Sequence, residues 1–315
     1  MTQNRRQYWE PKALAATGKS PQPVRSTNPE LIGKTRKPQF IGTGLLLILV
    51  LLSSWGCAGR LIQPLLVSMN SQTDLDLICE GGPAYLLIID SLIDKSPDNP
   101  ELLISAIKAY SAYTAVLPEC GRPERTIQIS DKTYRYARRL LTDQLNLHTD
   151  QDFQEFSTRV AKIGPNKLEQ LFWAGYGWAT WIRFHSGTVE AITELPRVER
   201  IMQRILELDE TYYHGSAHLF LGIIEGGKPA LLGGKPEDSR AHFERALAIN
   251  GRRYLPALVS YAEFYAKTTL NRELFETLLT EITEFPIESA PDIAAANLIA
   301  QKKGQRLLDQ IEDIF

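Results

Sequence analysis

The chain has 315 residues, of which 43% are hydrophobic and 23% are charged, so it can bury a substantial core. Residues 1–39 hold eight basic and two acidic side chains, which leaves 27 basic and 35 acidic ones in the rest. This acidic balance argues against a protein that neutralises nucleic-acid phosphates. Three cysteines exclude both a multi-disulfide framework and a four-cysteine zinc site.

The N-terminal region combines a basic polar segment with a long uncharged run. Residues 1–39 are rich in Pro, Gln, Ser and Thr and lack apolar periodicity, which predicts a disordered basic segment. Phe40–Gly59 then contains no charged residue, and Lys34, Arg36 and Lys37 precede it. Basic flanks stay on the cytoplasmic side of a membrane, so this pattern delivers the rest of the chain to the far side.

The end of this run offers a site for lipidation. Cys57 follows Gly56, and a cysteine in this place resembles the lipobox of bacterial lipoproteins. On this interpretation residues 40–57 are a signal segment and Cys57 becomes the lipid-carrying N-terminus. The run is also long enough to remain as an uncleaved inner-membrane anchor, which is the alternative. Ala58 is not the Asp that commonly retains lipoproteins at the inner membrane, which favours the outer membrane.

Residues 58–315 have helical periodicity almost throughout. Asn99-Pro100 predicts a helix start, because a capping side chain precedes a proline at the first helical position. A second helix is expected from near Pro123. Amphipathic stripes of the same period recur further along, and no alternating strand pattern is found, so the predicted fold class is all-α. These stripes lie at Val198–Ile205, Phe243–Leu247, Leu255–Ala262 and Leu274–Ile282.

Some of these segments resemble tetratricopeptide (TPR) helix pairs. His218–Gly222 is similar to the first helix of such a pair, and Pro236–Ile249 is similar to the second. The small-residue position of the second helix recurs at Ala137, Ile205 and Ala246, which are unevenly spaced. The sequence therefore predicts irregular TPR-like helix pairs in an α-solenoid-like bundle, preceded by a signal or anchor helix.

The densest aromatic cluster lies between Phe172 and Phe184. Six aromatic side chains in this stretch would point in nearly all directions from one helix. Such a helix is either deeply buried or partly lines an apolar cavity, because ligand sites between helices favour aromatic walls. The candidates for a ligand passage are Trp173, Tyr176, Trp178 and Trp181.

Two cysteines lie in the exported part, where the environment is oxidising. Cys79 and Cys120 either form a disulfide bond between neighbouring helices or remain small buried apolar side chains. Neither is expected to act as a nucleophile, because no histidine and asparagine pattern accompanies them.

His214 and His218 are four residues apart on a predicted helix, where two imidazoles could face one metal ion. The glutamate of the zincin motif and a third ligand are both missing, so packing or helix-end hydrogen bonding is the favoured role. The repeated Gly226-Gly-Lys-Pro229 and Gly233-Gly-Lys-Pro236 segments do not fit a phosphate-binding loop, because each lysine precedes proline rather than Ser or Thr. We expect a flexible connector there. No catalytic residue, cofactor or metal ion is predicted.

Several blocks in order along the chain resemble the TatT family, the T-component lipoproteins of tripartite ATP-independent periplasmic (TRAP) transporters. They are Gly82–Ile93, Ser96–Leu103, Leu171–Ala179, Tyr213–Gly222, Pro229–Glu237, Phe243–Leu247 and Leu307–Phe315. The resemblance implies a helical, repeat-derived protein that trimerises around hydrophobic pores. It also implies a partner, the periplasmic substrate-binding P-component, with which an apolar ligand is exchanged. The expected function is thus a non-enzymatic transport accessory, and the alternative is a TPR-type envelope scaffold that binds other proteins.

Overall fold

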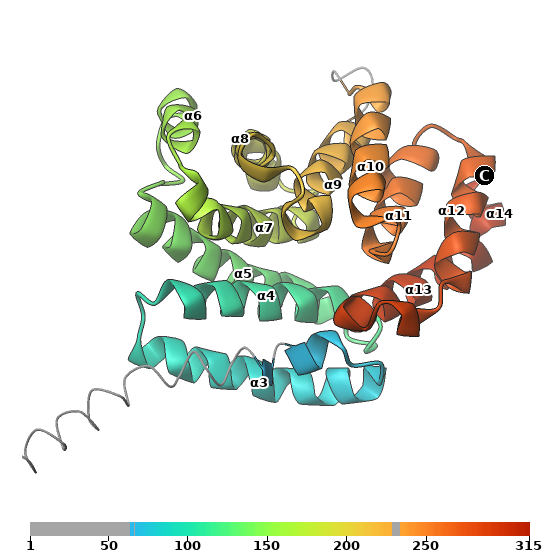
Figure 1. Cartoon of the computed structure of the whole chain (residues 1–315), viewed down its shortest axis with the longest axis horizontal. Coiled ribbons are helices and arrows are strands. Elements are labelled where there is room, and N and C mark those ends of the chain that lie inside the picture. The colour runs from blue at the N-terminus through green and yellow to red at the C-terminus, as the bar shows by residue number, and fades with distance from the viewer. Residues whose placement is uncertain (1–63, 66, 229–233) are drawn as a thin grey trace, which may run out of the picture. The chain divides into compact units, whose positions relative to one another are not determined.

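The computed structural model describes residues 64–65, 67–228 and 234–315 (Figure 1). The predicted basic segment, the uncharged run and Cys57 lie outside these residues, as does Pro229–Gly233 of the glycine-rich repeat. The described residues belong to one compact unit, Ser53–Phe315. Among them no helix is both long enough and apolar enough to cross a membrane.

The described part of the chain is helical and contains no strand, which confirms the predicted all-α class. The first long helices are α3 (Leu75–Lys95), α4 (Pro100–Val116) and α5 (Thr126–Arg139). The later elements are α6 (Phe153–Ala161), α7 (Leu168–Phe184), α8 (Val189–Asp209), α9 (Tyr212–Gly227), α10 (Pro236–Asn250), α11 (Leu255–Tyr261), the π-helix η6 (Ala262–Ala266), α12 (Arg272–Glu284), α13 (Ala294–Asp309) and α14 (Ile311–Ile314).

Polar residues in the sequence determine where several helices begin. Asn99 accepts hydrogen bonds from the backbone N–H groups of Glu101 and Leu102, so the predicted start of α4 is confirmed. Asp74 and Thr188 cap α3 and α8 in the same way. The helix expected near Pro123 begins as a short 3-10 turn and continues as α5. Each cap satisfies donors that a helix N-terminus leaves unpaired.

The helices share two apolar cores. One core lies among α3, α4, α5, α7 and α8, and the other among α10, α11, α12 and α13. α9 contributes to both, with Leu221 in the first core and Leu219 in the second. In Figure 1, α13 returns to the C-terminal end of α4, where Arg306 pairs with Glu119. This contact brings distant parts of the sequence together around one cavity.

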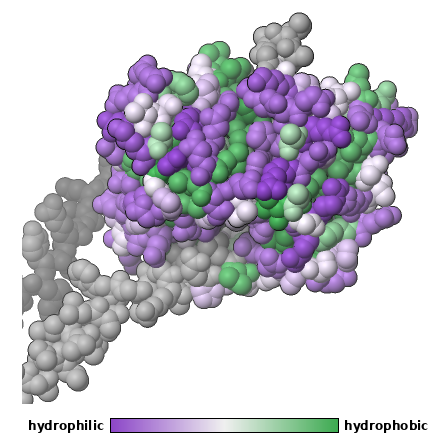
Figure 2. All heavy atoms as spheres, turned by 45° about the horizontal axis from the view of Figure 1, so that its top comes forward, coloured by the Kyte–Doolittle hydropathy of each residue, from purple (hydrophilic) through white to green (hydrophobic). Residues whose placement is uncertain are grey.

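The helix pair α9 and α10 is the part for which the sequence predicts TPR-like packing. Ser239 of α10 donates a hydrogen bond to the carbonyl oxygen of Gly222 in α9, at 2.8 Å, and Phe243 is fully buried. The α-solenoid-like arrangement of irregular TPR-like helix pairs remains a prediction. Figure 2 shows that hydrophilic residues dominate one face of the molecule and that hydrophobic residues gather in bands between them.

Candidate functional site

A cavity of about 430 Å³ lies between helices from both cores. Its walls come from α3, α4, α7, α11 with η6, and α13, together with Tyr213 of α9. The volume falls within the range of roughly 300–1,000 Å³ that is usual for sites of small molecules. This cavity is therefore the candidate ligand site.

Four of the wall segments run in the same direction along the cavity. Lys108 of α4 lies over the Trp173 ring of α7 at 4.7 Å, and Asn297 of α13 accepts a hydrogen bond from the backbone of Leu255 at 3.0 Å. Further along the same helices, Lys303 of α13 pairs with Glu263 of η6 at 2.5 Å, and Arg306 pairs with Glu119. The cavity thus has two chemically different ends.

The first end is lined by aromatic rings. Trp173, Tyr176, Tyr213 and Tyr254 lie there, with the ring centroids of Trp173 and Tyr213 only 4.7 Å apart. Burial raises the pKa of the Tyr176 and Tyr213 hydroxyls above the ordinary value for tyrosine. The phenols are therefore neutral at physiological pH and can donate hydrogen bonds to a ligand.

The second end is charged. Arg183, Lys303 and Arg306 line it together with Glu119 and Glu263. The pKa of Lys303 is lowered, chiefly because burial removes water from its ammonium group and secondarily because Arg183 and Arg306 repel its charge, although Glu263 opposes both effects. Arg183 is exposed to solvent, so this end of the cavity reaches the surface.

Two of the four aromatic residues singled out from the sequence lie in this cavity. Trp173 and Tyr176 line its wall. Trp178 is completely buried elsewhere and packs edge-on against Phe156, at 6.1 Å between centroids. Trp181 points away from the cavity and donates a hydrogen bond to Asp131 at 3.0 Å. A role for any of them in ligand binding remains a proposal.

Sequence reasoning missed Tyr213, because its place depends on an unusual backbone. Tyr213, His214 and Gly215 have φ angles of 46°, 62° and 72°, in the left-handed region that side chains other than glycine rarely adopt. This turn directs the Tyr213 ring against Trp173 and into the cavity, where 37% of the residue stays accessible. Two such non-glycine residues in succession store strain of the kind that often accompanies functional sites.

Because of this turn, His214 and His218 do not share one helical face, and the expectation from their spacing is wrong. His214 stacks on Tyr254, at 5.0 Å between ring centroids. The Nε2 atom of His218 instead lies 3.2 Å from a carboxylate oxygen of Glu210. The Nδ1 atom of His218 lies 2.9 Å from the Nδ1 atom of His242. The two imidazoles are separated because the backbone between them is not helical. Among the described residues, no group of three or more His, Cys, Asp or Glu side chains could hold a metal ion.

The surroundings of these histidines indicate that the stability of the folded chain depends on pH. Burial is the largest cause that lowers the pKa of His214, His218 and His242 in the folded chain. As the pH falls, the unfolded chain binds protons at these rings before the folded chain does, which favours unfolding. The histidines therefore do not weaken the fold above about pH 6.5, and the free energy of unfolding decreases below that pH. We expect the melting temperature to decrease as the pH is lowered from about 7.5 to about 5.5. Each imidazole ring changes the free energy of unfolding by at most about 1.4 kcal/mol per pH unit.

The measurement is thermal unfolding by circular dichroism across this pH range. His242→Gln should make the pH dependence shallower, because it removes one of the two imidazole rings that contact each other. An equal slope in the wild-type chain and in His242→Gln would contradict the prediction.

Cys79 and Cys120 are joined in a disulfide bond, and their Cα atoms are 5.6 Å apart. The bond links α3 to the segment that follows α4. Ile78 and Glu119, the neighbours of the two cysteines, both line the cavity. The disulfide therefore fastens the α3 wall of the cavity to α4.

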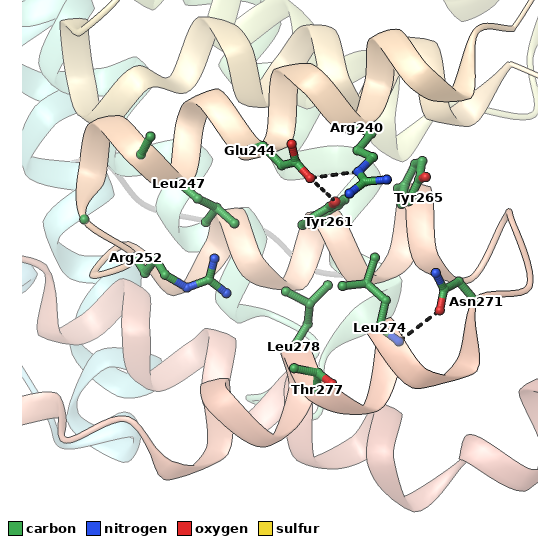
Figure 3. Close-up of a pocket in the computed structure, with 12 residues that line it drawn as sticks. Arg240, Glu244, Leu247, Arg252, Tyr261, Tyr265, Asn271, Leu274, Thr277 and Leu278 are labelled. Atoms are coloured by element: carbon green, nitrogen blue, oxygen red, sulfur yellow. Dashed lines mark hydrogen bonds and ion pairs between the residues drawn. The ribbon is translucent and has the colours of Figure 1, made fainter.

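A second, open hollow of about 650 Å³ lies between α10, α11 with η6, and α12 (Figure 3). Leu247 and Leu278 face each other across it from α10 and α12, and Tyr261 and Tyr265 form its rear. Its polar groups are already paired in part, since Glu244 accepts a hydrogen bond from Arg240 at 2.8 Å. We refer to this hollow as the α10–α12 groove.

Comparison with known proteins identifies the family. None of the curated proteins searched matches the chain. A family model described as TAtT, TRAP transporter T-component, matches residues 71–315, which include every wall segment assigned above and both cysteines of the disulfide. Components of this family are accessories of transport systems on the periplasmic side. The match covers most of the chain, and the protein therefore belongs to the TRAP transporter T-component family.

Proposed function

We propose that this protein holds an apolar ligand in its cavity and exchanges it with the substrate-binding P-component of a TRAP transporter. The observation that carries the proposal is the preformed cavity with its aromatic end. Trp173 is only 2% exposed and Tyr213 is held against it by a strained backbone, so the site exists without any rearrangement. A preformed site binds at a lower entropic cost than one that must be ordered.

The remaining parts of the proposal concern how the protein is held and assembled. It is anchored to the periplasmic side of a membrane through a lipid on Cys57, with an uncleaved N-terminal helix as the alternative. It forms a homotrimer, and the exposed apolar surface of α3 contacts the neighbouring protomer. Leu77, Leu87 and Ile88 are between 51% and 69% exposed on this helix, and apolar side chains of this kind are typical of contact surfaces.

The α10–α12 groove favours a second candidate function, that of an envelope scaffold. A TPR-type scaffold binds peptides in an open groove with polar and aromatic walls, and this groove has Arg240, Tyr261 and Asn271 in its lining. The enclosed cavity favours the transport accessory as the first proposal.

The test is a pull-down of the tagged, membrane-anchored protein from its own cells, with partners identified by mass spectrometry. We expect recovery of a periplasmic substrate-binding protein, with or without its membrane permease. Cys57→Ser serves as a control for the anchor, since it should remove the protein from the membrane fraction if the cysteine carries the lipid. Recovery of envelope-assembly or cell-wall proteins alone would instead favour the scaffold.

A further inference from the structure

The charged end of the cavity has one cation more than its carboxylates neutralise. Glu263 pairs with Lys303 and Glu119 pairs with Arg306. Arg183 also lines the cavity, and within residues 64–65, 67–228 and 234–315 it forms no ion pair. Its guanidinium group therefore remains available at the point where the cavity meets solvent.

Arg183 and Lys303 both line the charged end of the cavity, and the charge of Arg183 contributes to the lowered pKa of Lys303. A ligand that brings a negative charge between the two side chains would relieve this repulsion. Guanidinium groups bind planar oxyanions through two parallel hydrogen bonds, and such charge-assisted bonds are stronger than neutral ones. The geometry of this end thus complements an oxyanion.

The opposite end complements an apolar tail. Lys108 is the cation that lies there, and it is already paired with Glu169 at 3.4 Å and covers the Trp173 ring. The distance between the ends follows from α4, because the helix rises by roughly 12 Å from Lys108 to its last residue, Val116, at 1.5 Å per residue, and Glu119 lies in the turn that follows. A single alkyl chain of medium length fits this distance.

We propose that the cavity binds a linear apolar molecule ending in an oxyanion, with the oxyanion held by Arg183 and Lys303 and the tail against Trp173 and Tyr213. The inference rests on the proposed function, in which the cavity holds a ligand. The oxyanion is a carboxylate, as in a free fatty acid, or a phosphate, as in a lipid head group.

The test uses probes that carry bromine at the end of the tail, which quenches nearby tryptophan fluorescence. ω-Bromoundecanoate, ω-bromoundecyl phosphate and the uncharged ω-bromoundecanol are titrated into the full-length chain in nanodiscs, with empty nanodiscs as the reference. We expect the anionic probes to quench at concentrations about tenfold lower than the alcohol, and the better of the two anions identifies the head group. Trp173→Phe should remove most of the quenching.

Arg183→Gln isolates the head site, because this exposed side chain forms no ion pair with any residue that the structure describes. It should raise the anion concentration needed for half-quenching by about tenfold and leave that of the alcohol unchanged. Arg240→Gln, in the α10–α12 groove, is the matched control and should behave like the wild type. Equal concentrations for anions and alcohol would overturn the head site but keep the cavity as a ligand site. Quenching by none of the probes would overturn the ligand cavity itself, and unchanged quenching in Trp173→Phe would overturn the orientation.

Discussion

Gly226→Ala is expected to destabilise the folded chain by about 3 kcal/mol, because the added methyl group has no space. A Cβ atom at this position would lie 2.1 Å from the carbonyl oxygen of Phe264 and 2.7 Å from the hydroxyl oxygen of Ser239. The first of these atoms belongs to the backbone of η6, so it cannot move aside without displacing a helix that lines the cavity. For a unit of this size, the loss corresponds to a fall in melting temperature of roughly 6–12 °C.

Gly227→Ala is a closely matched control, since it changes the next residue of the same helix. Its Cβ atom would come no closer than 3.9 Å to another group, so its melting temperature should stay within about 2 °C of the wild type. Circular dichroism of both variants decides the matter. Equal melting temperatures for the two alanine variants would show that η6 does not approach α9 as closely as the structure has it.

Asp90→Ala is expected to cost about 3 kcal/mol, because Asp90 is the polar centre that fastens α3 to α4 and α5. Its carboxylate accepts hydrogen bonds from the hydroxyl groups of Tyr110 at 2.8 Å and Tyr136 at 2.6 Å, and it pairs with Lys132. Alanine would leave the two phenols and the lysine without this partner in a half-buried place. The α3 wall of the cavity would then lose its polar attachment and keep only its apolar packing on α4 and the disulfide.

Asp94→Ala, one turn further along α3, provides the comparison because its side chain is exposed. Urea unfolding should show a lower midpoint for Asp90→Ala alone, with an unchanged slope if the folded state keeps its size. If both variants unfolded at the same midpoint as the wild type, the three contacts of Asp90 would have no net effect on stability.

The general architecture could be predicted from the sequence because it depends on local signals. Helical periodicity and the capping side chain of Asn99 indicated an all-helical chain, and the ordered blocks of residues indicated the family. Both predictions are confirmed. Such signals need only residues that are near one another in the sequence, and α4 satisfies them without help from the rest of the fold.

The cavity was harder to predict because its walls come from segments that are far apart in the sequence. Trp173 and Trp178 have the same chemistry and lie on the same helix, yet one lines the cavity and the other is packed against Phe156. Which face of α7 meets which neighbour depends on how α4, α5 and α8 pack around it. The left-handed turn at Tyr213 and His214 carried no signal either, because only the adjacent Gly215 favours that backbone.

The disulfide between Cys79 and Cys120 also has a consequence for the biogenesis of the protein. Thiols are kept reduced in the cytoplasm and are oxidised after export, so this covalent link is made only once the chain has been translocated. Until then α3 is attached to α4 by noncovalent contacts alone. The covalent link between α3 and the end of α4 is therefore complete only in an oxidising compartment, such as the periplasmic side on which components of this family act.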